Sequence, residues 1–433
     1  MYRFKVNKIL LFLVITVFGI YSIQLITGFS EGTENFIFRI IVGIIFVYCI
    51  YRGVHDSKLI NPYLLFSITP FSLLMYSDKI SPTYLVKLNT DTWVLAIINM
   101  IAFLIALSLT KGRKVIDSSN INLEAMAKSK RYVLTKHCIL FFIIGHIPTV
   151  YSTVFGGTMP YASTLSLFSF FAIVCAFRTK NRLLITGVLF LTLLSFTGGF
   201  NKTAFLFLGM TIVISLEKYY FQNNKSKLRL IGIITVTAIL GIFVAFPLKD
   251  YMSTGGSLFS FFNDRNNTGM QYYEGKINWT EHPSLMLPYM YLVSSWTNVQ
   301  YVMLTQDTST FGLWLLKPLL GYFSMDKFFD SYYSLFSYSS FNTFTFVSVV
   351  YKDFGFYGSI FGTMFLGWFV KKVYLRYINT NSSLDTAVYA LTACAVLQMF
   401  FSNHFLMLSY PFTIFILSWI YKKIIPLSER KDL

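Results

Sequence analysis

The sequence contains little charge for its length. Only 13% of its 433 residues are charged, against about 25% in an ordinary soluble protein. Acidic residues are the scarcer kind, with 19 Asp and Glu against 36 Lys and Arg, and the net charge is +17. Because 55% of the residues are hydrophobic and they crowd into long runs without amphipathic periodicity, we do not expect a water-soluble fold.

Cysteine is also scarce, and all four residues fall in apolar runs: Cys49, Cys138, Cys175 and Cys394. This pattern offers neither a disulfide framework nor a metal site, so we predict four small buried side chains and no metal. A nucleic-acid-binding module is missing too, so nucleic acid is not an expected partner. The first apolar run lacks a small-residue cleavage site after it, which favours a retained membrane span.

Long apolar runs are what the sequence has in abundance. They measure about 17–22 residues, the length that a helix needs to cross a bilayer. We therefore predict an all-α polytopic membrane protein with about 12 transmembrane helices. The predicted spans are residues 9–27, 36–51, 60–76, 92–110, 136–154, 162–177, 183–198, 203–220, 229–247, 356–371, 385–401 and 404–421.

Lysine and arginine are concentrated in every second connection between these spans. Because basic residues collect in cytoplasmic loops, this alternation predicts that these connections and both termini lie in the cytoplasm. The lipid bilayer then accounts for most of the excess positive charge. The basic clusters fall within residues 3–8, 52–58, 111–136, 178–182, 218–229, 371–376 and 422–431.

The largest connection on the other side covers residues 248–355. It is rich in aromatic residues, Ser and Asn, which argues against disorder, and loops of this length in compact proteins are usually functional. Its semi-apolar stretch 285–304 favours an amphipathic helix on the membrane surface, with a re-entrant segment or a full span as alternatives. We divide the chain into nine helices over 1–247, this outward loop, and three helices with a cytoplasmic tail over 356–433.

Charged residues beside the outward ends of spans are candidates for function, because charge is costly at membrane depth. Lys202 follows a Gly-Gly turn before the eighth span, where a snorkelling lysine is the alternative. Lys249 and Asp250 begin the large loop, and Lys352 and Asp353 end it. Interfacial ion pairing, or helix capping by Asp353, would explain these four without any function.

Four more polar residues complete the set of candidates. Arg265 can bind two phosphate oxygens at once with its planar guanidinium. His282 in the large loop and His404 in the short turn before the last span can act as bases near neutral pH. Asn342 opens an aromatic stretch at the end of the loop. Either histidine is also compatible with an ordinary surface or interfacial position.

Residues 342–358 read Asn-Thr-Phe-Thr-Phe-Val-Ser-Val-Val-Tyr-Lys-Asp-Phe-Gly-Phe-Tyr-Gly. The Asn-Thr aromatic start and the Tyr-x-Asp-Phe-Gly-x-x-Gly element resemble the Wzy-type polymerases of O-antigen and capsule repeat units. Asn61-Pro62, the Gly-Gly-x-x-Lys turn at 198–202 and the overall topology are similar to that family as well. Its members often carry Arg where this chain has Lys202, which keeps the positive charge but loses bidentate phosphate binding.

The resemblance implies a multi-spanning, lipid-donor glycosyltransferase of GT-C-like architecture in the bacterial cytoplasmic (inner) membrane. It would join undecaprenyl-diphosphate-linked oligosaccharide repeat units on the outer face, without a cofactor. A chain-length regulator and a flippase of the same pathway would be its partners. Lys202, Lys249, Arg265 and Lys352 would stabilise the diphosphate, and Asn342 would hold sugars. The base for the acceptor hydroxyl would come from Asp250, Asp353, His282 and His404.

Two other functions stay open. An O-antigen ligase has a similar layout but would pass the glycan to a lipid A core. A polysaccharide flippase or other transporter suits twelve spans with both termini inside, although transporters often show pseudo-symmetric halves and this sequence shows no internal repeat.

Overall fold

The computed structural model is helical throughout the part of the chain that it describes, and no strand occurs among those residues. This confirms the all-α prediction. The described residues are 15–17, 31–56, 58–76, 88–109, 128–157, 162–196, 202–221, 232, 283–305, 309, 311–312, 345–401 and 409–424. The predicted spans 9–27 and 229–247 therefore lie almost entirely outside the described residues.

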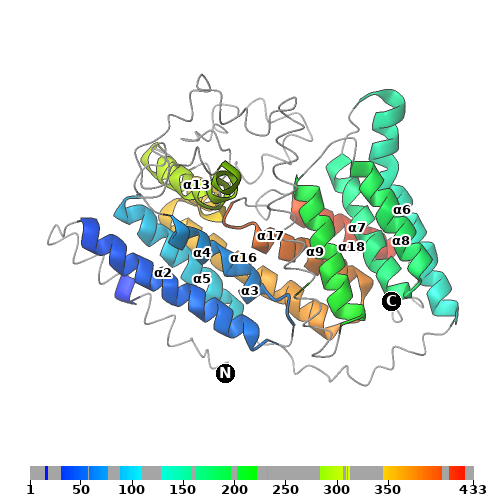
Figure 1. Ribbon diagram of the computed structural model, residues 1–433, viewed down its shortest axis with the longest axis horizontal. Helices are drawn as coiled ribbons and strands as arrows, with labels where there is room; N and C mark the ends of the chain where they lie inside the picture. Colours follow the sequence, from blue (N-terminus) through cyan, green and yellow to red (C-terminus); the bar gives the residue numbers. More distant parts are fainter. Residues whose placement is uncertain are drawn as a thin grey trace.

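The helices form two packed groups (Figure 1). The first group joins helices that are far apart in the sequence, since α16 packs closely against α5. It consists of α2 (Glu31–Val54), α3 (Pro62–Phe66), α4 (Ile68–Met75), α5 (Thr90–Leu109), α13 (Pro283–Thr305) and α16 (Phe346–Asn379). The second group consists of α6 (Lys128–Phe155), α7 (Ala162–Thr179), α8 (Arg182–Phe196), α9 (Lys202–Tyr219) and α18 (Ser409–Ile424).

A single helix joins the two groups. α17 (Ser383–Leu397) packs against α7 and α9 on one side and against α3 and α16 on the other. Every residue from Ser383 to Val396 is buried, so this helix has protein on all sides. Its small residues, such as Ala387 and Ala393, permit that close packing. α17 is thus the centre of the fold.

Glycine brings the most closely packed helix pairs together. A Cβ added at Gly145 of α6 would lie 2.4 Å from the backbone nitrogen of Ser169 on α7. A Cβ added at Gly367 of α16 would lie 2.5 Å from the carbonyl oxygen of Phe103 on α5. Small residues at helix interfaces are typical of membrane proteins, where van der Waals packing drives association.

Within the part of the chain that the structure describes, three helices are long and apolar enough to cross a membrane: Phe36–Val54, Thr90–Leu109 and Arg131–Phe155. Four shorter apolar helices accompany them within the described residues. α2 and α6 also expose wide apolar faces, with Val47 63% and Val154 65% exposed, as expected for contact with lipid. The chain is therefore a membrane protein, and the total of 12 spans stays a prediction.

The predicted span 60–76 is divided into α3 and α4. The Asn61 side chain accepts hydrogen bonds from the backbone N–H groups of Tyr63 and Leu64, both at 3.1 Å, and so caps α3. Pro62 occupies the first helical position, where a missing N–H has no consequence. Asn61 and Pro62 thus form the start of α3, whereas α3 and α4 are divided at Ser67.

α16 is kinked at Gly355, whose φ of 65° and ψ of −165° are not helical. The longer segment after the kink contains the predicted span 356–371 and continues to Asn379. The shorter segment before it begins at Thr345, whose hydroxyl accepts from the Ser348 N–H at 3.3 Å. Thr345 caps this first segment, and Asp353 lies inside it, two residues before the kink, so a capping role of Asp353 toward the following helix stays a prediction.

The expected surface helix at 285–304 is also wrong in its environment. α13 covers this stretch, but all residues from 293 to 300 are buried, which leaves no face for water. Trp296 Nε1 donates to Ser72 Oγ at 2.9 Å, and Tyr289 OH donates to the Met75 carbonyl at 3.2 Å. Its polar residues thus bind other helices, so α13 is an internal helix across the end of α4.

Candidate functional site

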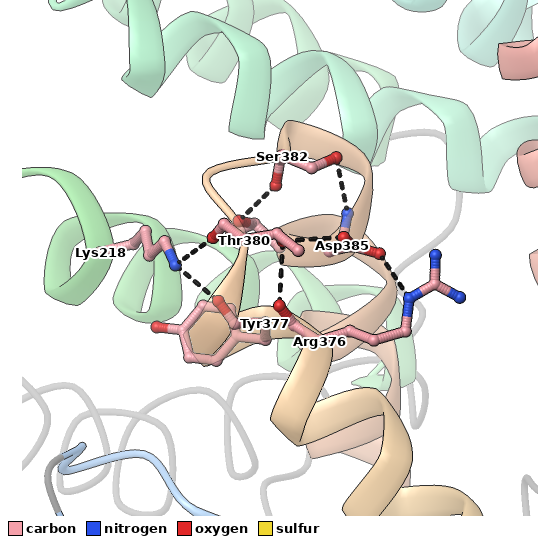
Figure 2. A network of polar contacts seen from close by, with 7 residues as sticks. Lys218, Arg376, Tyr377, Thr380, Ser382 and Asp385 are labelled. Carbon is pink, nitrogen blue, oxygen red and sulfur yellow. Dashed lines mark hydrogen bonds and ion pairs between the residues drawn. The ribbon is translucent and has the colours of Figure 1, made fainter. Parts of the chain in front are cut away.

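Four of the cation-rich connections meet at one end of the molecule, which we call the basic end. They are the connections after α2, α7, α9 and α16. Lys218, at the end of α9, donates to the carbonyls of Tyr377 and Thr380 at 2.5 and 2.8 Å (Figure 2). Its ammonium also lies 4.7 Å from the Tyr377 ring centroid. A cation at the last carbonyls of α16 is favourable, because these carbonyls have no helical partner.

Glu217, next to Lys218, contacts the opposite kind of backbone group. Its carboxylate is buried and accepts from the N–H groups of Leu59 and Ile60 at 2.5 and 3.2 Å. Asn61 strengthens this turn by donating to the Lys58 carbonyl at 2.8 Å. Two adjacent side chains of α9 therefore bind the start of α3 and the end of α16, so Asn61 and its neighbours have a structural role.

The turn from α16 to α17 is closed by an ion pair. Arg376 Nε lies 3.3 Å from Asp385 Oδ1, and Thr380 Oγ1 donates to Asp385 Oδ2 at 2.8 Å (Figure 2). Burial raises the pKa of Tyr377 well above its usual range, so this phenol is neutral. Arg178 reaches the same turn from α7 and donates to Ser383 Oγ at 3.1 Å. The charges at the basic end thus join loops to one another.

The other end of the molecule, which we call the opposite end, holds Lys352 and Asp353. The two residues are 9% and 0% exposed, on the short segment of α16 before the kink. The Asp353 carbonyl accepts from the Phe311 N–H at 2.8 Å, which brings part of the large loop against α16. Gly312, with φ of 86°, forms the adjoining turn. A buried lysine and aspartate beside a kink are candidates for function.

α13 supplies the polar surroundings of this end. Gln300 Oε1 accepts from the Asn89 N–H at 2.7 Å, just before α5 begins. Ser295 Oγ donates to the Phe400 carbonyl, just after α17 ends. Thr297 Oγ1 and Gln398 Oε1 are buried without a hydrogen-bond partner among the described residues. Buried polar atoms of this kind usually bind water or a ligand.

The structure places three of the nine predicted site residues. Lys352 and Asp353 lie together on α16, and Lys202 begins α9, where only its backbone is described. Lys352 and Asp353 were expected next to the start of a helix. In the structure they are buried within α16, just before its kink. The remaining candidates lie outside the described residues: Asp250, His282, His404, Lys249, Arg265 and Asn342.

Sequence reasoning missed Arg39, which is half-buried on α2 at the opposite end. Its NH1 lies 3.5 Å from the Leu74 carbonyl, and its Cζ lies 5.7 Å from the Trp93 ring centroid. The signal was available, because an arginine four residues into an apolar span is costly and calls for a reason.

Comparison with known proteins adds no relative, because no family model, curated protein or solved structure matches the chain.

Proposed function

We propose that this membrane protein is a glycosyltransferase that joins oligosaccharide repeat units carried on undecaprenyl diphosphate. The observation that carries the proposal is the burial of Lys352 and Asp353 immediately before the Gly355 kink. Both residues belong to the Tyr-x-Asp-Phe-Gly-x-x-Gly element that resembles the Wzy-type polymerases. Removing charges from water is unfavourable, and buried charges in a membrane protein usually mark a functional site.

The proposed reaction is a displacement at the anomeric carbon of the lipid-linked donor. The acceptor hydroxyl oxygen forms the new glycosidic bond, while the bond from the anomeric carbon to the diphosphate oxygen breaks. Asp353 takes the proton of the acceptor hydroxyl, and undecaprenyl diphosphate leaves as the anion. Lys352 stabilises the negative charge that develops on the departing diphosphate.

The loop residues complete this proposal. Lys202, Lys249 and Arg265 bind the diphosphate oxygens together with Lys352, and Asn342 holds a sugar. Asp250, His282 and His404 are the other bases within reach of the same membrane face.

The positions of the two ends favour a reaction on the outer face. The α16 segment from Gly355 to Lys371 rises about 24 Å, which is close to the thickness of the bilayer core. If the basic end lies in the cytoplasm, as its cation-rich loops predict, then Lys352 and Asp353 lie near the outer surface. That is the membrane face where lipid-linked repeat units would be joined.

A deletion strain tests the reaction class through its surface glycan. Loss of a polymerase leaves surface lipid with a single repeat unit. A ligase defect leaves polymer on undecaprenyl lipid and none on the lipid A core, and a flippase defect leaves the repeat unit inside the cell. We expect the first result, together with chain growth by the purified protein on defined lipid-linked units. An unchanged glycan ladder would refute the proposal.

A further inference from the structure

Helix α2 carries an arginine near each end of its apolar segment. Arg39 and Arg52 are 13 residues apart, which corresponds to about 20 Å along the helix. Both guanidinium groups lie against aromatic rings, with Arg39 Cζ 5.7 Å from the Trp93 centroid and Arg52 Cζ 5.5 Å from the Tyr63 centroid. The two residues therefore form a matched pair at opposite ends of one helix.

Their surroundings differ. Arg52 lies at the basic end, where Asp56 interacts with it electrostatically and cation-rich loops are expected. Arg39 lies at the opposite end, beside the last turn of α4 and the first turn of α5. Among the described residues it forms no ion pair, and its one hydrogen bond is the 3.5 Å contact of NH1 with the Leu74 carbonyl. The positive-inside rule explains Arg52 but does not explain Arg39.

The position of Arg39 suits a phosphate group. A guanidinium has five N–H donors, and a ring face with one long hydrogen bond leaves most of them available. Arg39 lies one helical turn inside Phe36, where the apolar segment begins, so its long side chain can reach the depth of lipid headgroups. Its planar fork can bind two phosphate oxygens, and the nearby Trp93 ring attracts the cation and so favours this position of the guanidinium.

We propose that Arg39 binds the phosphate oxygens of a membrane-lipid headgroup at the opposite end. The diphosphate of a lipid-linked donor and the single phosphate of a phospholipid present the same chemistry to it. The choice of the donor lipid rests on the proposed function, whereas the phosphate site itself does not.

Lipid binding to the purified full-length protein in nanodiscs of a galactolipid, which carries no phosphate, tests the site. The probes are radiolabelled undecaprenyl diphosphate in one arm and phosphatidylglycerol in the other. We expect Arg39→Gln to weaken binding of at least one probe about tenfold, because a charge-assisted contact is lost. Arg39→Lys should lose less affinity, since lysine keeps the positive charge but lacks the planar guanidinium that binds two oxygens. A loss confined to undecaprenyl diphosphate identifies the donor lipid, and a loss confined to phosphatidylglycerol identifies phospholipid.

Arg52→Gln is the matched control and should leave both affinities within about twofold of wild type, because its partner groups belong to the basic end. Thermal unfolding of each variant in the same nanodiscs separates lost binding from lost folding. Equal affinities of wild type and Arg39→Gln for both probes would overturn the site, as would an equal loss in Arg52→Gln. The proposed function fails separately, through an unchanged glycan ladder in the deletion strain.

Discussion

The two ends of the molecule use charge in different ways. At the basic end, Glu217 and Lys218 bind backbone groups of α3 and α16, and Arg376 pairs with Asp385 across a turn. At the opposite end, Lys352 and Asp353 are buried within one helix, next to a kink and a polar internal helix. Charge at the basic end thus holds helices together, while charge at the opposite end is buried beside a kink, where we propose that it serves chemistry.

The largest expected effect on activity comes from replacing a buried aspartate at each end by asparagine, one at a time. Asp353→Asn should reduce chain polymerisation about 100-fold or more, because an amide cannot accept the hydroxyl proton. Asp385→Asn at the basic end should lower stability through loss of the contact with Arg376, with normal activity for each folded molecule. Polymerisation by purified protein, normalised to folded protein, measures both. Equal specific activities in the two variants would remove the distinction between the ends.

The next largest effect is expected for helix packing, and substitutions of a tightly packed glycine and an open one form a matched pair. Gly367→Ala should destabilise the protein by about 1–3 kcal/mol, since its Cβ would meet the Phe103 carbonyl at 2.5 Å. Gly43→Ala should be neutral or slightly stabilising, because no atom lies within 4 Å of its added Cβ. Thermal unfolding in detergent micelles compares them. A stable Gly367→Ala variant would contradict the close packing of α5 and α16.

Lys218→Met tests the contacts between α9 and the end of α16 at the basic end. Loss of the two contacts with the Tyr377 and Thr380 carbonyls should cost about 1.5–3 kcal/mol, because both are bonds to a charged donor. Methionine keeps most of the side-chain volume, so the effect should report the ammonium group. Thermal unfolding gives the loss of stability, and polymerisation per folded molecule should stay at the wild-type level. A large loss of specific activity would assign chemistry to this end as well.

Among the disruptive substitutions, the smallest expected loss of stability is at the kink. Gly355→Ala should cost about 1–2 kcal/mol, because residues with a Cβ are strained at φ of 65° and ψ of −165°. The nearest atom, Ser309 Oγ, lies 3.6 Å from the added Cβ, so backbone strain and not a clash is responsible. If the kink positions Asp353, polymerisation per folded molecule should fall as well. A Gly355→Ala variant with wild-type stability and wild-type polymerisation would show that the kink has no role.

Much of the helical framework follows from the sequence. Apolar runs of membrane-spanning length predict α5 and α6. The alternation of basic clusters predicts that connections such as those at Arg52 and Arg376 lie on one side, and the structure brings them together. These features depend on local composition, which a single sequence contains.

The environment of α13 could not be predicted in the same way. Ser295 and Trp296 look like the polar face of a surface helix, yet their partners are Phe400 and Ser72, which are 105 and 224 residues away. The partners of Arg39 could not be predicted either, because Leu74 and Trp93 meet it only in the fold, although its place inside an apolar run was a signal in the sequence. Lys352 and Asp353 became candidates because a local motif carries them, and their role in a site stays a prediction.

Thiol labelling of intact and lysed cells tests the arrangement of the two ends most directly. The four native cysteines are buried, so a cysteine introduced at Phe311, which is 85% exposed, or at Arg376, whose side chain is 71% exposed, gives the readable signal. A membrane-impermeant maleimide should label Phe311→Cys in cells with a permeabilised outer envelope, and Arg376→Cys only after lysis. Labelling of both positions from the same side, or of Arg376→Cys from outside alone, would contradict an outward-facing transferase site.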